Sequence, residues 1–155
     1  MIVRGAVPPG IMVAAVGVLV LAGCGRSRPP MVAASGTVTL GGKPLPKVRL
    51  EFTPTFPGFG GELFAIGEAG DDGVFRPANG VGAGICAGSY KVTIHEMPPP
   101  AELQEYRMDT PARQKEYYAK LANRPIPERY GALTSTPVEV TIEPGTIDFV
   151  IALER

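Results

Sequence analysis

Several short segments of this chain show a regular alternation of apolar and polar residues, and this pattern constrains the fold more than any other feature. In one segment the apolar Val48, Leu50 and Phe52 are separated by Arg49 and Glu51. Similar alternation occurs over residues 37–40, 90–94, 138–143 and 147–153. Successive side chains of a β-strand point to opposite faces of a sheet, so a period of two predicts strands with one buried face. The chain is therefore expected to build its core between the apolar faces of β-sheets.

Turn-forming residues separate the predicted strands. They are Gly-Gly-Lys-Pro at 41–44, Asp-Asp-Gly at 71–73 and Pro-Gly at 144–145. These residue types favour the backbone angles of tight turns. We expect the strand before residue 41 to pair antiparallel with the strand at 48–52, and the last two strands to form a hairpin around residues 144–145. About seven short strands joined in this way predict an all-β, immunoglobulin-like antiparallel sandwich.

Composition limits the classes of function. The chain has 15 basic and 15 acidic residues, so it lacks the strongly basic surface that a nucleic-acid partner requires. His95 is its only histidine, which excludes a metal site built from several histidines. A serine triad would have to use His95, and the alternation places this residue on the outward face of its strand. We therefore expect no enzymatic activity, no cofactor and no metal.

Three local motifs have structural interpretations that are simpler than functional ones. The glycine-rich run at 79–88 leads into a strand, whereas a phosphate-binding loop opens a helix, so we interpret it as a flexible loop between strands. Glu68, Asp71 and Asp72 lack the ligand spacing of an EF-hand and are expected to belong to a plain hairpin turn. Cys86 is expected to be a small, half-buried hydrophobic side chain, with a reactive thiol and an intermolecular disulfide as alternatives.

Residues 98–137 interrupt the alternation and form a proline-rich insertion. Three prolines occupy positions 98–100, and Thr110-Pro111 is typical of a helix N-cap followed by proline at the first helical position. The run 112–122 has good helix propensity. Its apolar side chains form a narrow stripe of Tyr117, Tyr118 and Leu121. This stripe could lie against the sandwich, or it could bind a partner.

The N-terminal residues have the features of a signal peptide. Arg4 precedes an apolar stretch over residues 11–22, which is shorter than the roughly 20 residues of a membrane-spanning helix. The stretch ends in Leu-Ala-Gly-Cys at 21–24, which resembles the lipobox of bacterial lipoproteins. The resemblance implies cleavage between Gly23 and Cys24. It also implies that Cys24 carries diacylglycerol and an amide-linked fatty acid such as palmitate.

Membrane lipid attached to Cys24 would anchor the chain without a spanning segment, because two acyl signals make a stable anchor where a single chain gives only marginal binding. Residues 24–34 are expected to be a tether. There are two alternatives to lipidation. The chain could be an ordinary secreted protein whose signal ends in a cysteine, or Cys24 could form a disulfide with Cys86. Gly25 stands where an Asp retains other lipoproteins in the inner membrane, which favours the outer membrane of the cell envelope.

The order of strands and turns provides a further resemblance. Its evidence is the sequence at 35–45, 48–52, 72–75, 88–93, 126–130 and 134–138. These runs resemble the carboxypeptidase regulatory-like, or transthyretin-like, domain and the small bacterial lipoproteins that carry this domain alone. The resemblance implies a β-sandwich domain over residues 35–155 with the insertion at about 98–137. It implies no hydrolysis, because the domain is an accessory to the peptidase and this chain lacks the zinc ligands of the peptidase.

Two functions are compatible with these expectations. The first is a non-catalytic, membrane-anchored structural or protein-interaction module of the cell envelope. The second is a module that binds carbohydrate or another small ligand through exposed aromatic faces. The candidate aromatic residues are Phe56, Phe59, Tyr106, Tyr117 and Tyr118. Clustering of these side chains on one open surface would favour the second function.

Overall fold

The computed structural model describes residues 27–101 and 110–155, and β-strands are the main secondary structure of these residues. The elements, in chain order, are β1 (Met31–Val32), β2 (Ser35–Leu40), β3 (Lys43–Pro44), β4 (Val48–Pro54), the 3₁₀ helix η1 (Gly61–Leu63), β5 (Ala65–Glu68), β6 (Val74–Phe75), β7 (Ala78–Asn79), β8 (Gly82–Ala83), β9 (Ile85–Cys86), β10 (Gly88–Glu96), α2 (Pro111–Ala119), the 3₁₀ helix η2 (Glu128–Tyr130), β11 (Glu139–Ile142) and β12 (Asp148–Leu153). The strands outnumber the seven expected, because several are two-residue segments that the alternation could not reveal.

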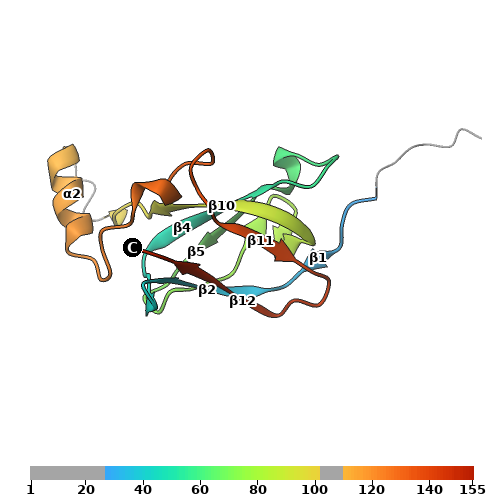
Figure 1. Cartoon of the computed structure of the whole chain (residues 1–155), viewed down its shortest axis with the longest axis horizontal. Helices are drawn as coiled ribbons and strands as arrows, with labels where there is room; N and C mark the ends of the chain where they lie inside the picture. Colours follow the sequence, from blue (N-terminus) through green and yellow to red (C-terminus); the bar gives the residue numbers. More distant parts are fainter. Residues whose placement is uncertain (1–26, 102–109) are drawn as a thin grey trace, which may run out of the picture.

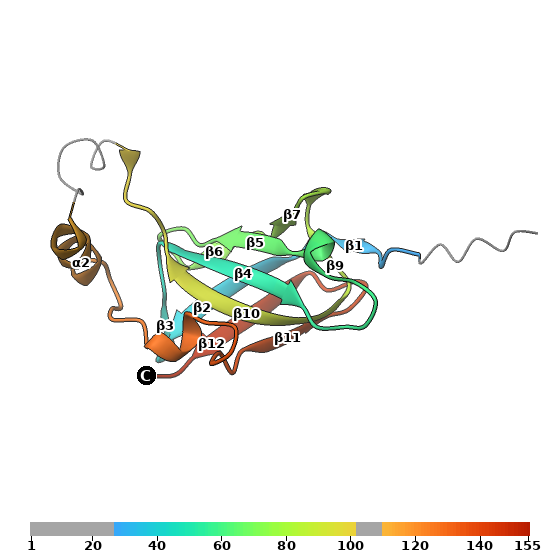
Figure 2. The same ribbon diagram turned by 90° about the horizontal axis from the view of Figure 1, so that it is seen from above.

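The strands pack as two layers (Figures 1 and 2). The larger sheet has the order β11-β10-β4-β5-β7-β8, and the smaller has the order β12-β2-β3 with β6 also beside β2. A separate ribbon joins β1 to β9. Within the described part of the chain every strand pair is antiparallel except β2 with β12, which run parallel. The prediction of an all-β sandwich is confirmed.

Two of the predicted strand pairings are wrong. Strand β2 turns back onto the short β3, while β4 lies in the other sheet between β10 and β5. Strand β11 pairs with β10 and β12 pairs with β2, so the turn at 144–145 connects the two layers instead of closing a hairpin. Each of these strands has one apolar face. Placing successive strands in opposite layers lets both faces meet in the same core.

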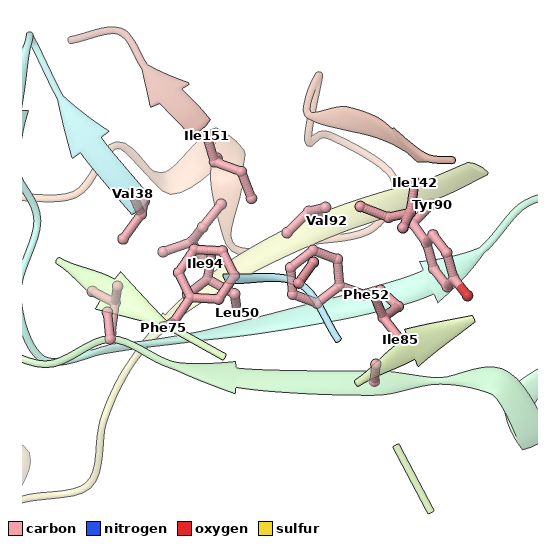
Figure 3. Close-up of a cluster of buried hydrophobic side chains, with 14 of the residues drawn as sticks. Val38, Leu50, Phe52, Phe75, Ile85, Tyr90, Val92, Ile94, Ile142 and Ile151 are labelled. Carbon is pink, nitrogen blue, oxygen red and sulfur yellow. The ribbon is translucent and has the colours of Figure 1, made fainter. Parts of the chain in front are cut away.

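Aromatic rings fill the centre of that core. The Phe52 ring centroid lies 5.9 Å from that of Phe75 and 6.3 Å from that of Tyr90. Figure 3 shows these rings among aliphatic side chains from both sheets. Phe75 fits because Gly36 and Gly67 have no side chains: a Cβ at Gly67 would lie 2.6 Å from its ring, and one at Gly36 would lie closer still. Both glycines are therefore needed for packing, because the Cβ of an alanine at either position would clash with the Phe75 ring.

The sandwich begins earlier in the chain than predicted. Met31 and Val32 pair with Cys86 and Ile85, and Val32 is only 6% exposed. Residues 31–34 therefore belong to the sandwich and not to the tether. The same pairing contradicts the interpretation of residues 79–88 as a flexible loop. Ile85 and Cys86 are fully buried, so this glycine-rich run supplies part of the core.

Candidate functional site

Helix α2 forms where the sequence predicts a helix, and it stands apart from the sandwich. The Thr110 hydroxyl accepts a hydrogen bond from the backbone N–H of Arg113 at 3.4 Å, and Pro111 is the first helical residue. No residue of α2 is buried, and Figure 2 shows the helix beyond the end of the two sheets. The rings of Tyr117 and Tyr118 contact each other, with centroids 5.4 Å apart. The predicted apolar stripe therefore does not cover the core.

A hollow of about 570 Å³ lies between α2 and the sandwich. Its lining is mostly apolar and comes from both sides: Pro111, Gln114, Lys115, Tyr118 and Ala119 of the helix, and Glu96, Arg124, Pro125 and Ile126 of the sandwich side. Of the predicted stripe, Tyr118 lines the hollow, while Tyr117 and Leu121 are half-buried outside its lining. The volume falls within the range of roughly 300–1,000 Å³ that is usual for ligand pockets.

Arg124 and Glu96 form a two-pronged ion pair at this hollow. Arg124 Nε donates to Glu96 Oε1 at 2.7 Å, and Nη2 donates to Oε2 at 2.7 Å. The Arg124 side chain is 3% exposed and that of Glu96 is 25% exposed. Arg124 Nη2 also donates to the backbone carbonyl of Pro46 at 2.8 Å. Because the two charges neutralise each other, Lys115 is the remaining charged side chain of a lining that is otherwise mostly apolar.

Tyr118 is one of the polar groups that α2 contributes to the hollow, together with Gln114 and Lys115. Burial raises the pKa of the Tyr118 hydroxyl, and the negative charge of Glu96 and the neighbouring Tyr117 raise it further. The hydroxyl is therefore neutral at physiological pH and can both donate and accept a hydrogen bond. An aromatic ring with a neutral hydroxyl suits an interface that is apolar with a few specific polar contacts.

The residues that fix the insertion to the sandwich are not among those that sequence reasoning singled out. Asn123 Nδ2 lies 3.0 Å from the carbonyl oxygens of Leu40 and Lys43, and 3.1 Å from that of Pro44. We refer to Asn123 and Arg124 together as the clasp. Asn123 has a φ of +60°, a conformation that asparagine tolerates. An Asn that follows a helix and closely precedes a proline is a typical stop signal, and this was the available clue.

Beyond the clasp the predicted insertion is part of the sandwich. Tyr130 is 3% exposed, and its hydroxyl accepts from the backbone N–H of Glu154 at 2.9 Å and donates to the carbonyl of the same residue at 3.0 Å. Thr136 is buried, and its hydroxyl donates to the carbonyl of Val92 at 2.7 Å. The peripheral part of the insertion therefore ends before Asn123, much earlier than the predicted boundary at residue 137.

Phe56 and Phe59 lie at the end of the sandwich opposite to α2. The Phe56 ring is 5.7 Å from that of Phe59 and meets the ring of Tyr90 edge-on at 5.7 Å. It also lies over Gly88, where any Cβ would collide with it. Phe56 thus covers one end of the core. The described candidate aromatic residues do not gather on one open surface, and Tyr106 lies outside the described residues.

The remaining candidate residues, His95 and Cys86, contact neighbouring side chains of the sandwich. His95 Nε2 lies 3.0 Å from the Thr93 hydroxyl and 3.8 Å from the Glu51 carboxylate. Cys86 is more deeply buried than expected, with its Sγ 3.4 Å from Sδ of Met31. Within residues 27–101 and 110–155, no group of three or more His, Cys, Asp or Glu side chains is placed to hold a metal ion.

The turn at 71–73 is stabilised by its own aspartate. The Asp72 carboxylate accepts from the backbone N–H of Val74 at 2.9 Å, and Gly73 has a φ of +77°. Asp71 forms an exposed ion pair with Lys47 at 3.1 Å. The turn interpretation is thus correct for Asp71 and Asp72, whereas Glu68 is the last residue of β5. The turn connects β5 in the larger sheet to β6 in the smaller one, so it is not the hairpin that its sequence suggests.

The predicted lipidation and cleavage site at Gly23 and Cys24 lies outside the described residues. Within the part of the chain that the structure describes, no helix combines the length and apolar character needed to cross a membrane.

Comparison of the chain with protein-family models found no match, and comparisons with curated proteins and with solved structures found none either.

Proposed function

We propose that this protein is a non-catalytic lipoprotein of the cell envelope, anchored through lipid on Cys24, that presents its α2 end to a partner protein. The lipobox-like sequence at 21–24 supports the anchor, and Gly25 supports the outer membrane as its location. The β-sandwich is the fold that the resemblance to carboxypeptidase regulatory-like domains implies. The observation that carries the proposal is that the chain enters the sandwich at β1, whereas α2 projects from the opposite end (Figure 1).

Strand register supports this arrangement independently of the picture. Strand β10 begins at Gly88, close to the β1–β9 ribbon, and ends at Glu96, which bonds to Arg124 beside α2. Its nine residues span roughly 30 Å at about 3.3 Å per residue. A domain anchored at the β1 end would therefore hold α2 about that distance farther from the membrane, where a partner could reach it.

The chemistry of the hollow favours a protein partner. Tyr118 and Ile126 contribute apolar surface, and the Arg124–Glu96 pair has little charge left for a polar ligand. An apolar segment of a partner that carries one or two hydrogen-bonding groups would fit such a lining. The size of the hollow also suits a small ligand, so binding of carbohydrate or another small molecule is the second candidate function.

The anchor is tested by comparing Cys24→Ala with Cys86→Ala, since these are the only two cysteines of the chain. Both variants are expressed with the full chain in a bacterial host that is supplied with a labelled fatty acid. We expect Cys24→Ala to lose the label and to leave the detergent-rich phase on phase separation, because the thiol that accepts the lipid is gone. Cys86→Ala should keep both properties. Retention of the label by Cys24→Ala would refute lipidation at this residue.

The α2 end is tested by introducing a photo-crosslinking residue at Tyr118 or, as a control, at Val150. Val150 is 67% exposed on β12 and lies outside the hollow. In intact cells we expect a crosslinked protein adduct from position 118 and none from position 150. Equal adducts from both positions, or none from position 118, would count against a partner at this end. Protection of position 118 by a soluble oligosaccharide would favour the second candidate.

A further inference from the structure

The end of the sandwich where the chain enters consists of four segments, which we call the tether end: residues 27–32, 54–61, 79–82 and 143–147. Hydrogen bonds place these segments around one end of the two sheets: Ala87 N–H donates to the Pro30 carbonyl at 2.9 Å, and Asn79 Nδ2 lies 3.5 Å from Met31 Sδ. Thr55 N–H donates to the Ser89 carbonyl at 2.9 Å, and Ser35 N–H donates to the Ile147 carbonyl at 2.8 Å. Figures 1 and 2 both show β1 at this end and α2 at the other.

Three large apolar side chains are exposed at the tether end: Ile147 at 73%, Val81 at 54% and Met31 at 38%. Two of them are held outward by tight turns. The Asn79 side chain accepts from the backbone N–H of Val81 at 2.9 Å, and the Thr146 hydroxyl accepts from that of Glu143 at 3.1 Å. The alternation predicted that Ile147 points inward with Phe149. It lies instead in the connection before β12, where nothing in the described chain covers it.

The length of chain between Cys24 and Met31 limits how far the tether end can be from an anchored lipid. Seven residue steps span at most about 25 Å when fully extended, since each residue adds no more than about 3.6 Å. The tether end is thus the part of the sandwich that an anchored chain brings to the membrane. Exposed apolar side chains that would be unfavourable in water become favourable when they enter the boundary between head groups and acyl chains.

Charge does not provide the attraction at this end. Backbone N–H groups of Glu62 and Gly60 lower the pKa of the Glu62 carboxyl, and the positive charge of the nearby Arg28 adds a smaller effect. Glu143 and Asp148 bring further negative charge to the same end. Within the four segments the charged residues are Arg28 and Glu143, and the acidic Glu62 and Asp148 directly adjoin them, so among the described residues this end has no excess of positive charge to attract anionic lipids. Contact with a membrane would depend on apolar side chains.

We propose that the tether end rests on the lipid bilayer, with Ile147, Val81 and Met31 inserted at the membrane interface, so that the sandwich stands upright with α2 pointing away. This inference depends on the proposed anchoring at Cys24. It adds that the domain has a fixed orientation and does not move freely at the end of its tether. The bilayer surface is its ligand, and acidic lipid is not required.

The absence of tryptophan from the chain allows a direct test with single tryptophan probes. Ile147→Trp, Val81→Trp and, as a control, Leu133→Trp are made in the full-length, lipidated protein. Leu133 is 45% exposed and lies in the connection between η2 and β11, away from the tether end. Each protein is reconstituted into phosphatidylcholine vesicles with brominated acyl chains, with and without phosphatidylglycerol. Circular dichroism verifies that each variant is folded.

We expect emission from positions 147 and 81 to shift to shorter wavelength and to lose intensity in brominated vesicles, whereas position 133 does neither. Phosphatidylglycerol should not strengthen the effect. Equal quenching at all three positions, or none at 147 and 81 in protein that still floats with vesicles, would overturn the orientation while leaving the anchor intact. A wavelength shift that depends on protein concentration and not on vesicles would assign the surface to a second copy. Loss of flotation altogether would refute the anchor itself.

Discussion

The two halves of the proline-rich insertion look alike in sequence but differ in their relation to the sandwich. Residues 111–119 form a helix with no buried residue. Residues from Asn123 onward contribute the buried Tyr130 and Thr136, together with an arginine whose side chain is 3% exposed. Both halves interrupt the strand pattern, and both contain charged residues and prolines. The difference is that the second half supplies hydrogen-bonding partners for backbone groups in the sandwich, whereas residues 111–119 form a helix without a buried side chain.

This contrast separates a part of the molecule that maintains the fold from a part that is available to a partner. The clasp joins three carbonyl groups around the turn at 40–44 to the end of β10. Unpaired buried polar groups are costly, so the clasp residues are constrained by stability. The exposed face of α2 has no such constraint. Three predictions test the contrast, beginning with the largest expected effect.

Arg124→Ala should destabilise the protein most. It removes the hydrogen bonds that Nε and Nη2 donate to the Glu96 carboxylate and the bond to the Pro46 carbonyl. Removing one partner of a buried ion pair costs about 3–5 kcal/mol, and we expect the lower end because Glu96 is 25% exposed. Denaturant unfolding measures the loss. Arg124→Lys keeps the charge but not the two-pronged geometry, so it should restore only part of the stability. A loss below about 1 kcal/mol, typical of a surface pair, would contradict a structural role.

Asn123→Gly and Asn123→Ala should have intermediate effects that differ from each other. Glycine accepts the φ of +60° but loses the amide that bonds to three carbonyl groups, at a cost of about 1–2 kcal/mol. Alanine also strains the backbone, which adds about 1–2 kcal/mol. The two unfolding free energies therefore separate the hydrogen bonds from the conformation. A glycine variant as stable as the parent would show that the amide contributes nothing to the clasp.

Replacement of residues 101–121 by a glycine–serine linker should have the smallest effect on stability. The change leaves the clasp intact, and loop-closure free energy varies by only about 0.6 kcal/mol for each doubling of loop length. We expect unfolding free energy to change by less than about 1 kcal/mol, while crosslinking at the α2 end is lost with Tyr118. A loss as large as that of Arg124→Ala would mean that the helix supports the sandwich, and the contrast between the halves would fail.

The faces of the strands were predictable from sequence, but their partners were not. Val48, Leu50 and Phe52 are all fully buried, as the alternation requires, because alternation is a local property of extended backbone. Pairing depends on where each strand lies in the finished sandwich. The turn residues at 41–44 and 144–145 indicate that the chain changes direction there. They do not indicate whether the next strand joins the same sheet or the opposite one. For that reason both expected pairings failed although both turns were recognised.

The candidate site was predictable only in part, for a related physical reason. Thr110 and Pro111 mark the start of α2 through local geometry, so the helix and its stripe of tyrosines could be expected. The clasp depends on backbone carbonyl groups about 80 residues away, and these groups leave no trace in the side-chain sequence. Ile147 shows the converse. Extending the alternation of β12 to the preceding residue predicted that Ile147 is in the core, but this residue is exposed.

The parallel pairing of β2 with β12 determines when the smaller sheet can be completed. Ser35 pairs with Asp148 and Leu40 pairs with Leu153, so β2 acquires its parallel neighbour only after almost all the intervening chain is available. Contacts between residues so distant in sequence slow folding. A chain that emerges N-terminus first, from a ribosome or through a membrane channel, would hold one edge of β2 unpaired until residue 153 has appeared. Loss of a few residues near the C-terminus would consequently disrupt a strand formed near the N-terminus.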